Sequence, residues 1–233
     1  MNTLPGLIGK KLGFTQVFDA SGNVARVTVV EAGPCVVVRK RTEEKDGYTA
    51  LQLSFGERRA KLTSKPLQGY FDKSKAPART IKNKQGHDIQ VYPRTLKEIR
   101  LSAEEAAKYN EGDVLTASDI FKEGQFVDVS GTTIGRGFSG VIRRHHFAGF
   151  VSSHGTHEYF RHGGSIGTNM TPGRTLPGKK MPGQHGNTRS TMQNLKVVRV
   201  IADQNLVLIE GAVPGAAEGI VTVRGAIKNG RHA

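Results

Sequence analysis

Residues 131–189 differ in composition from the sequence on either side. This 59-residue stretch holds 13 glycines, three prolines, six of the chain's eight histidines and eight Lys or Arg, but a single acid, Glu158. Its long middle, residues 149–189, has neither helical nor strand periodicity and cannot bury enough apolar surface to fold alone. A basic, glycine-rich arm of this kind needs a polyanion to order it, and RNA is the first candidate.

The overall charge also predicts a polyanionic partner. The formal net charge is +14, and the stretch carries +7 of it, from eight cations and one acid. A membrane surface is the weaker candidate, because the basic residues do not gather on one face of an amphipathic helix. No apolar run approaches the roughly 18 residues that a membrane span needs. Met1–Gly9 is too short and too weakly apolar for a signal peptide, so we expect a cytoplasmic protein.

Cysteine usage adds one structural expectation. Cys35 is the only cysteine, which excludes an internal disulfide. Because it begins the apolar run Cys35–Val38, we expect a buried and inert thiol.

Both ends of the chain are typical of short antiparallel strands. The expected strands cover residues 12–18, 24–31, 35–41 and 48–55, then 195–202, 206–210 and 219–227. Helices are expected near residues 65–73 and, behind a capping box at Ser102–Glu105, as far as about Tyr109. The predicted fold is mainly β with an α+β insert, as a barrel built from both chain ends plus a long extended Gly/Arg-rich loop.

This prediction divides the chain into five segments. They are N-terminal barrel strands (1–57), an α+β insert (58–124), a strand, glycine turn and short helix (125–148), an extended arm (149–189), and C-terminal barrel strands (190–233).

Gly135, Gly137 and Gly140 have the spacing of the dinucleotide fingerprint G-x-G-x-x-G. A dinucleotide site also needs a second strand that ends in an acid about 20 residues on, and the histidine- and glycine-rich segment there does not predict a strand. A glycine turn before a helix can instead present backbone N–H groups to an RNA phosphate, with Arg143 and Arg144 close by. A purely structural tight turn is the alternative.

Three other patterns resemble enzyme sites and each is incomplete. Residues 173–180 nearly match a P-loop, but Lys180 stands where a Mg²⁺-binding hydroxyl is needed. His154, His157 and His162 invite a metal site, yet no Cys or Asp joins them, and histidine rings can instead stack on unpaired bases. Ser152 and Ser153 beside His154 lack the G-x-S-x-G elbow of a catalytic serine.

A further set of motifs resembles a known family. Within the run Phe121–Arg144 the matching positions are Phe121, Asp128, Gly131, Thr133, Gly135, Arg136, Gly137, Gly140 and Arg144. More matches follow at Gly164–Gly167, Thr171–Gly173, Gly178–Met181, Gly183–Gln184 and Gly211–Gly215, and Gly6–Thr15 resembles the family's opening. Together these closely resemble the universal large-subunit ribosomal protein L-three family of the bacterial type, over nearly the whole chain.

The resemblance implies a translation-protein-type β-barrel with an α+β insert and a loop that penetrates ribosomal RNA toward the peptidyl transferase centre. It implies a structural protein, not an enzyme, that binds 23S ribosomal RNA early in large-subunit assembly beside neighbouring large-subunit ribosomal proteins. No cofactor, metal, membrane or homo-oligomer is implied. The loop tip corresponds to Thr168, Asn169, Met170 and Pro172. Many bacterial members have an amide-methylated glutamine where this chain has Met170, so that modification is not expected here.

The expected RNA-binding residues are the cations of the acid-poor stretch, namely Arg136, Arg143, Arg144, Arg161, Arg174, Lys179, Lys180 and Arg189. One alternative is a nucleotide- or metal-dependent enzyme that uses the Gly135–Gly140 turn or His154, His157 and His162. Another is a non-ribosomal RNA chaperone. The broken motifs argue against the enzyme, and a chaperone would not need so large an ordered barrel.

Overall fold

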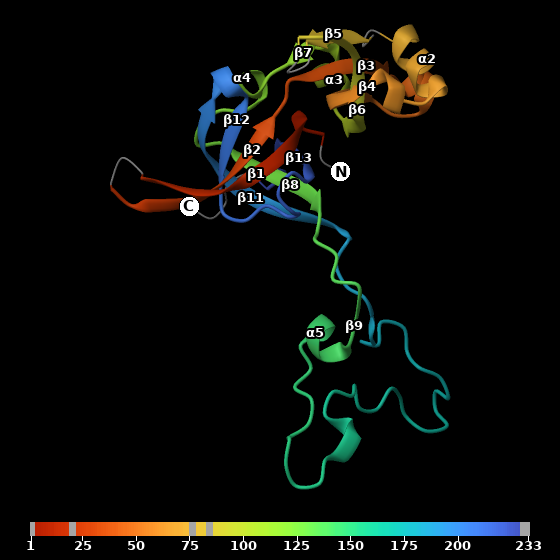
Figure 1. Ribbon diagram of the computed structural model, residues 1–233. Coiled ribbons are helices and arrows are strands. Elements are labelled where there is room, and N and C mark those ends of the chain that lie inside the picture. Colours follow the sequence, from red (N-terminus) through yellow and green to blue (C-terminus); the bar gives the residue numbers. More distant parts are fainter. Residues whose placement is uncertain (1–2, 19–21, 75–77, 83–85, 229–233) are drawn as a thin grey trace. The chain divides into compact units, whose positions relative to one another are not determined.

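The computed structural model describes residues 3–18, 22–74, 78–82 and 86–228, and it is mainly β, with several sheets (Figure 1). The chain divides into two compact units, which are described separately. Unit 1 comprises residues 1–132 and 189–233, and unit 2 comprises residues 133–188. No helix in the described part of the chain is both long enough and apolar enough to cross a membrane.

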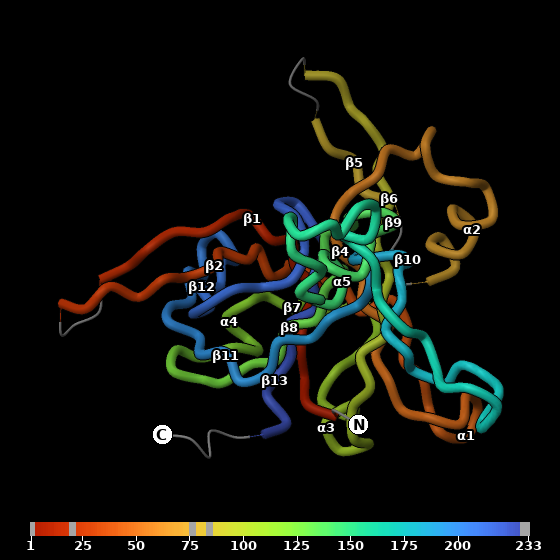
Figure 2. Tube along the Cα trace, turned by 90° about the horizontal axis from the view of Figure 1, so that it is seen from below, coloured from red at the N-terminus to blue at the C-terminus, as the bar shows by residue number. Residues whose placement is uncertain are grey.

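Six antiparallel strands of unit 1 pair in a closed ring. Their order is β1–β13–β8–β11–β12–β2, and β2 pairs back with β1. Their bounds are β1 Gly6–Phe18, β2 Val24–Ala32, β8 Phe126–Thr132, β11 Arg189–Ile201, β12 Leu206–Glu210 and β13 Ile220–Gly225. Figure 2 shows the long β1 and β2 side by side, as their pairing requires. The ring therefore joins strands from both ends of the chain.

Branched apolar side chains form the core of the ring, and glycines let its strands approach. Leu7, Val129 and Val223 are fully buried in one cluster. A Cβ at Gly9 would lie 2.7 Å from the carbonyl oxygen of Glu31, so a larger residue would force the strands apart. This close approach explains why β1 begins at Gly6, although propensity predicts a strand only from residue 12.

A second sheet of unit 1 has the order β5–β6–β4–β3–β7. Its strands are β3 Cys35–Arg41, β4 Ala50–Arg59, β5 Arg79–Lys82, β6 Asp88–Arg100 and β7 Val114–Leu115. The expectation that all of residues 1–57 contribute barrel strands is wrong for β3 and β4, which pair with β6 and β7 of the insert. Gly33, with a φ of +92°, turns the chain after β2, and β3 then starts in the second sheet.

Short helices connect these strands. They are α1 Glu43–Asp46, α2 Lys65–Lys73, α3 Ala103–Ala107 and α4 Ala117–Ile120, with the 3₁₀ turns η1 Ala60–Leu62 and η3 Ala202–Gln204. The predicted helix over residues 65–73 is confirmed as α2. The predicted start at Ser102 is also confirmed, because its hydroxyl accepts a hydrogen bond from the backbone N–H of Glu105 at 3.3 Å.

The predicted burial of Cys35 is confirmed. Its side chain is fully buried, and its Sγ donates to the carbonyl oxygen of Ile8 at 3.3 Å. Burial raises the pKa of the Cys35 thiol to about 12, so the reactive thiolate is nearly absent at neutral pH.

Unit 2 has little regular structure and almost no core. Its elements are β9 Phe138–Ser139, α5 Val141–His145, the 3₁₀ turn η2 His157–Tyr159 and β10 Gly183–Gln184. Only Ser139 and Val141 of residues 133–188 are buried. Between residues 149 and 182 the single regular element is η2, in agreement with the lack of periodicity predicted there.

Candidate nucleic-acid interface

Two segments from the ends of unit 2 are held together by backbone hydrogen bonds. Thr133 N–H donates to the carbonyl of Thr188 at 2.9 Å, and Arg136 N–H donates to the carbonyl of His185 at 2.8 Å. His185 N–H in turn donates to the carbonyl of Gly137 at 2.9 Å, and β9 pairs with β10. The glycine turn is therefore fixed against residues 183–188.

The three glycines of this turn are each needed for a different structural reason. Gly137 has a φ of +67°, a conformation that L side chains rarely adopt. Gly140 is the N-cap residue of α5 and has no side chain with which to cap the first turn. Gly135 lies close to Asn187: a Cβ added at Gly135 would be only 3.3 Å from the Cβ of Asn187. The turn thus directs the chain into α5, which carries Arg143 and Arg144.

The two neighbouring side chains Arg144 and His145 bind one carbonyl oxygen. Arg144 Nη1 donates to the carbonyl of Met181 at 2.7 Å, and His145 Nε2 lies 3.1 Å from the same oxygen. The Arg144 guanidinium also packs against Gly183, where a Cβ would lie 2.6 Å from Nη1. The sequence predicts Arg144 only as a phosphate ligand. In the structure, its side chain also connects α5 to Met181 and Gly183.

His185 lies among these cations. Burial lowers the pKa of His185 from its ordinary value of 6.5, and the charges of Arg136, Arg143, Arg144 and His146 lower it further. Its Nδ1 is buried and has no hydrogen-bond partner among the described residues. Sequence reasoning did not single out His185, although it follows directly on the family match Gly183–Gln184 and lies in the acid-poor stretch.

We expect the ring protons of His185 to titrate below pH 6.5 in the folded protein. Because the folded pKa is lower than the unfolded one, the unfolded chain takes up the proton first. The contribution of this site to stability is then fully present above about pH 6.5 and is lost as the pH falls toward the folded pKa. Proton NMR checks this, with His185→Gln to assign the signal and denatured protein for comparison. A midpoint at or above that of the denatured chain contradicts it.

The residues predicted for the loop tip are all exposed. Met170 is 88% exposed, and Thr168 Oγ1 donates to the carbonyl of Thr171 at 2.9 Å. The Thr171–Pro172 peptide bond is cis, and Gly173 has a φ of +64°. Residues 168–173 therefore form a tight turn that presents an uncharged apolar side chain.

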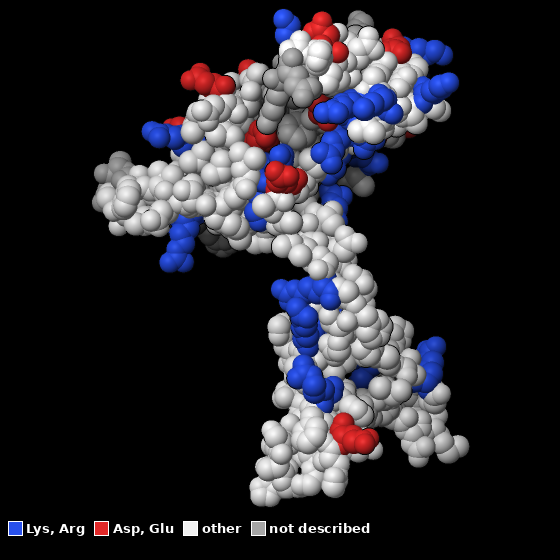
Figure 3. All heavy atoms as spheres, viewed as in Figure 1, with Lys and Arg blue, Asp and Glu red and all other residues white. Residues whose placement is uncertain are grey.

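The remaining predicted cations are exposed, and most belong to unit 2. Arg161, Arg174, Lys179 and Lys180 lie in its irregular part, where the only acid is Glu158. On the face drawn in Figure 3, unit 2 shows several Lys and Arg side chains and a single acidic one. Arg189 instead begins β11 of unit 1, opposite Thr132.

Comparison with known proteins agrees with these features. The family model described as ribosomal protein L3 matches residues 95–205, which include β8, all of unit 2 and β11. A large ribosomal subunit protein uL3 of Sorangium cellulosum is 55% identical over 98% of this chain and 92% of its own length. Its counterpart in Myxococcus xanthus is 50% identical over 97% of this chain and 94% of its own length. The chain belongs to the ribosomal protein L3 family. A uL3 of Corynebacterium jeikeium is 46% identical over 99% of this chain and 98% of its own length.

The histidines that suggested a metal site do not converge in this L3-family chain. His154 and His157 have φ values of +58° and +50°, and the His162 ring packs edge-on against Tyr159 with centroids 5.0 Å apart. Among the described residues, no three His, Cys, Asp or Glu side chains are grouped so as to hold a metal ion.

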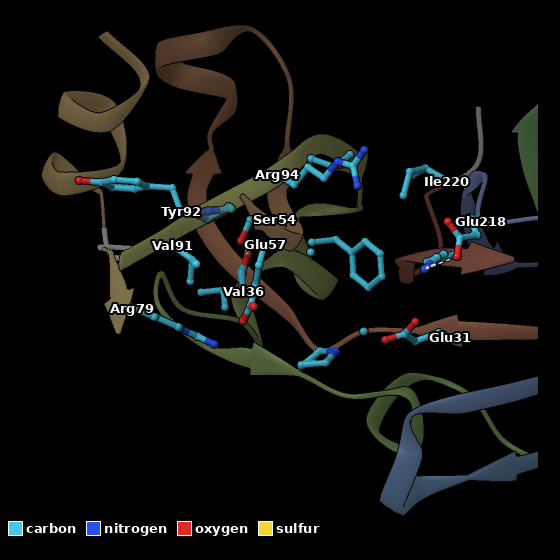
Figure 4. A pocket seen from close by; sticks show the side chains of 17 residues that line it. Glu31, Val36, Ser54, Glu57, Arg79, Val91, Tyr92, Arg94, Glu218 and Ile220 are labelled. Atoms are coloured by element: carbon cyan, nitrogen blue, oxygen red, sulfur yellow. Dashed lines mark hydrogen bonds and ion pairs between the residues drawn. The ribbon is translucent and has the colours of Figure 1, made fainter. Parts of the chain in front are cut away.

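A cavity of about 490 Å³ in unit 1 of the L3-family chain offers no catalytic arrangement (Figure 4). Its charged lining includes Lys10 and Glu218, which form an ion pair at 3.5 Å. The hydroxyl of Ser54, which also lines it, donates to the carbonyl of Val36 at 3.2 Å. The enzyme alternative therefore gains no support from this cavity.

Proposed function

We propose that this protein is a structural constituent of the large ribosomal subunit that binds 23S ribosomal RNA directly. The proposal rests chiefly on unit 2, which has seven Lys or Arg against one acid and only two buried residues. Such a segment gains its order from a polyanion rather than from a core of its own. Because the chain is similar over its full length to bacterial large ribosomal subunit proteins, we infer that the polyanion is RNA of that subunit.

The mechanism we propose is architectural. The cations Arg136, Arg143, Arg144, Arg161, Arg174, Lys179, Lys180 and Arg189 neutralise backbone phosphates, and the Gly135–Gly140 turn offers backbone N–H groups beside them. The arm, residues 149–189, becomes ordered on the RNA early in subunit assembly. Its tip, with Thr168, Asn169, Met170 and Pro172, reaches toward the peptidyl transferase centre in the cytoplasmic ribosome.

The scaffold in this proposal is the closed ring of six strands, which we take to be the translation-protein-type barrel. Its strands come from residues 6–32, 126–132 and 189–225, and the second sheet with its helices forms the α+β insert. The outer surface of unit 1 abuts neighbouring ribosomal proteins. No catalytic role, cofactor or homo-oligomer is part of the proposal.

The test is binding of the whole protein to the 3′ portion of 23S rRNA, with transfer RNA as competitor, over a series of salt concentrations. We expect competitor-resistant binding whose logarithmic salt slope is about −7 if all eight cations contact phosphates. Replacing Arg161, Arg174, Lys179 and Lys180 by glutamine should make that slope shallower by about 3 to 4. Binding no tighter than to transfer RNA would reduce the protein to a generic polycation and overturn the proposal.

A further inference from the structure

We propose that unit 1 carries a second RNA-binding surface, at the end of β4 and on η1 and α2, and that it binds the phosphate backbone of helical RNA rather than unpaired bases. This inference deepens the proposed function and rests on it. The surface is named here the α2 surface, and its cations are Arg58, Arg59, Lys61, Lys65 and Lys73. All five are exposed.

The cations of the α2 surface lack acidic partners. The ion pairs found among the described residues involve Lys10, Arg41 and Lys108, and none involves the α2 surface. Asp72 is the only acid between residues 58 and 84, and its carboxylate accepts hydrogen bonds from the Tyr92 hydroxyl at 3.1 and 3.3 Å. Figure 3 shows Lys and Arg side chains gathered over the part of unit 1 that carries α2. Clustered like charges repel one another until a polyanion offsets them.

The backbone under these cations is held firmly by buried contacts. Gln68 Nε2 donates to the carbonyls of Ala60 and Thr63, each at 2.8 Å, which joins α2 to η1. Phe71 is 2% exposed and stacks on Tyr92. The cations are thus presented by a pre-formed surface, in contrast to those of unit 2, and binding orders little additional backbone.

The aromatic rings of this region identify the kind of RNA contact. Recognition of unpaired bases depends on exposed aromatic faces on which the bases stack. Here Phe71 and Tyr92 are buried against each other, and the hydroxyl of the half-buried Tyr70 donates to the Gln52 side chain. The groups that the α2 surface exposes are therefore its cations, which bind backbone phosphates whatever the RNA sequence. The first turn of α2 also has no acidic residue to offset its partial positive charge.

The experiment compares three full-length variants on a plain RNA duplex with no 23S sequence. Lys61, Lys65 and Lys73 are replaced by glutamine in the first variant and by arginine in the second. The third replaces Lys45, Lys122 and Lys196, exposed lysines outside the α2 surface, by glutamine, so that it loses the same charge. Circular dichroism confirms that each variant is folded, and single substitutions replace the first variant if it is not.

We expect the first variant to have a salt slope shallower by about 2 to 3, while the arginine variant and the charge-matched control change by less than about 1. Equal slopes for the first variant and the control overturn the inference but leave the proposed function intact, because that function is tested against 23S rRNA. A loss confined to single-stranded RNA, or to vesicles of anionic lipid, overturns the assignment to helical RNA.

Discussion

Replacing Phe121 by alanine should lower the free energy of unfolding by about 3–5 kcal/mol. Phe121 follows α4 directly and is 2% exposed within the main hydrophobic cluster, so its removal leaves a cavity that the surrounding strands cannot easily fill. For a chain of 233 residues the loss corresponds to a melting temperature lower by roughly 10 °C. Thermal and urea unfolding, followed by circular dichroism, measure it.

Phe138 provides the matched control, because it has the same side chain in the same signature run and is 79% exposed. Phe138→Ala removes the same atoms but should change the unfolding free energy by less than about 0.5 kcal/mol. Similar losses for both variants would mean that Phe121 does not occupy the core as described.

In the free protein, trypsin should cut unit 2 long before it cuts the strands of unit 1. Arg161, Arg174, Lys179 and Lys180 are exposed and lie outside helices and strands, and the region around them has no buried residue. We expect the irregular part of the arm around these cations to be disordered without RNA, so a protease can bind it without first unfolding the protein. Mass spectrometry of the first fragments identifies the cut sites.

Cations in the paired strands of unit 1 are the internal control. Arg199 and Lys97 are equally good trypsin sites in sequence, but β11 and β6 hold their backbone in ladders. Bound 23S rRNA should suppress cleavage after the four sites of unit 2. Survival of unit 2 for as long as unit 1 in the absence of RNA, or sharp and dispersed NMR signals from residues 163–186, would contradict the expected disorder.

Strand alternation and turn chemistry predicted most local elements. The strand pair 195–202 and 206–210 was predicted from the turn residues at 203–205, and Asn205 does adopt a φ of +52° between β11 and β12. The helix at Lys65–Lys73 and the cap at Ser102 were likewise predicted from local chemistry. These features depend on neighbours in the sequence, which explains why they can be read from it.

The elements that sequence missed depend on distant neighbours. Nothing local distinguishes a strand of the ring from one of the second sheet, so β3 and β4 were assigned to the wrong sheet. The long β6 was not predicted, and it contains Pro93, a residue that the interior of a sheet disfavours. Pro93 pairs with Glu57 and lies past Val91, the last β6 residue that pairs with β5, so β6 has one partner there.

The candidate site shows the same division. The glycine turn, α5 and the exposed cations follow from composition and spacing. The shared carbonyl of Met181 and the place of His185 do not, since each requires residues 36 to 49 positions apart to meet across β9 and β10. Composition identifies a basic segment, whereas only the fold shows which cations also hold it in shape.

The pairing of β1 with β13 has a consequence for the order of events during synthesis. Gly6 pairs with Arg224, so the ring cannot close until nearly the entire chain has left the ribosome that makes it. Unit 2 precedes β13 in the sequence and has no core that must form first. A nascent chain therefore exposes its basic segment to RNA while unit 1 is still open, and anchoring to nucleic acid can begin before the protein has finished folding.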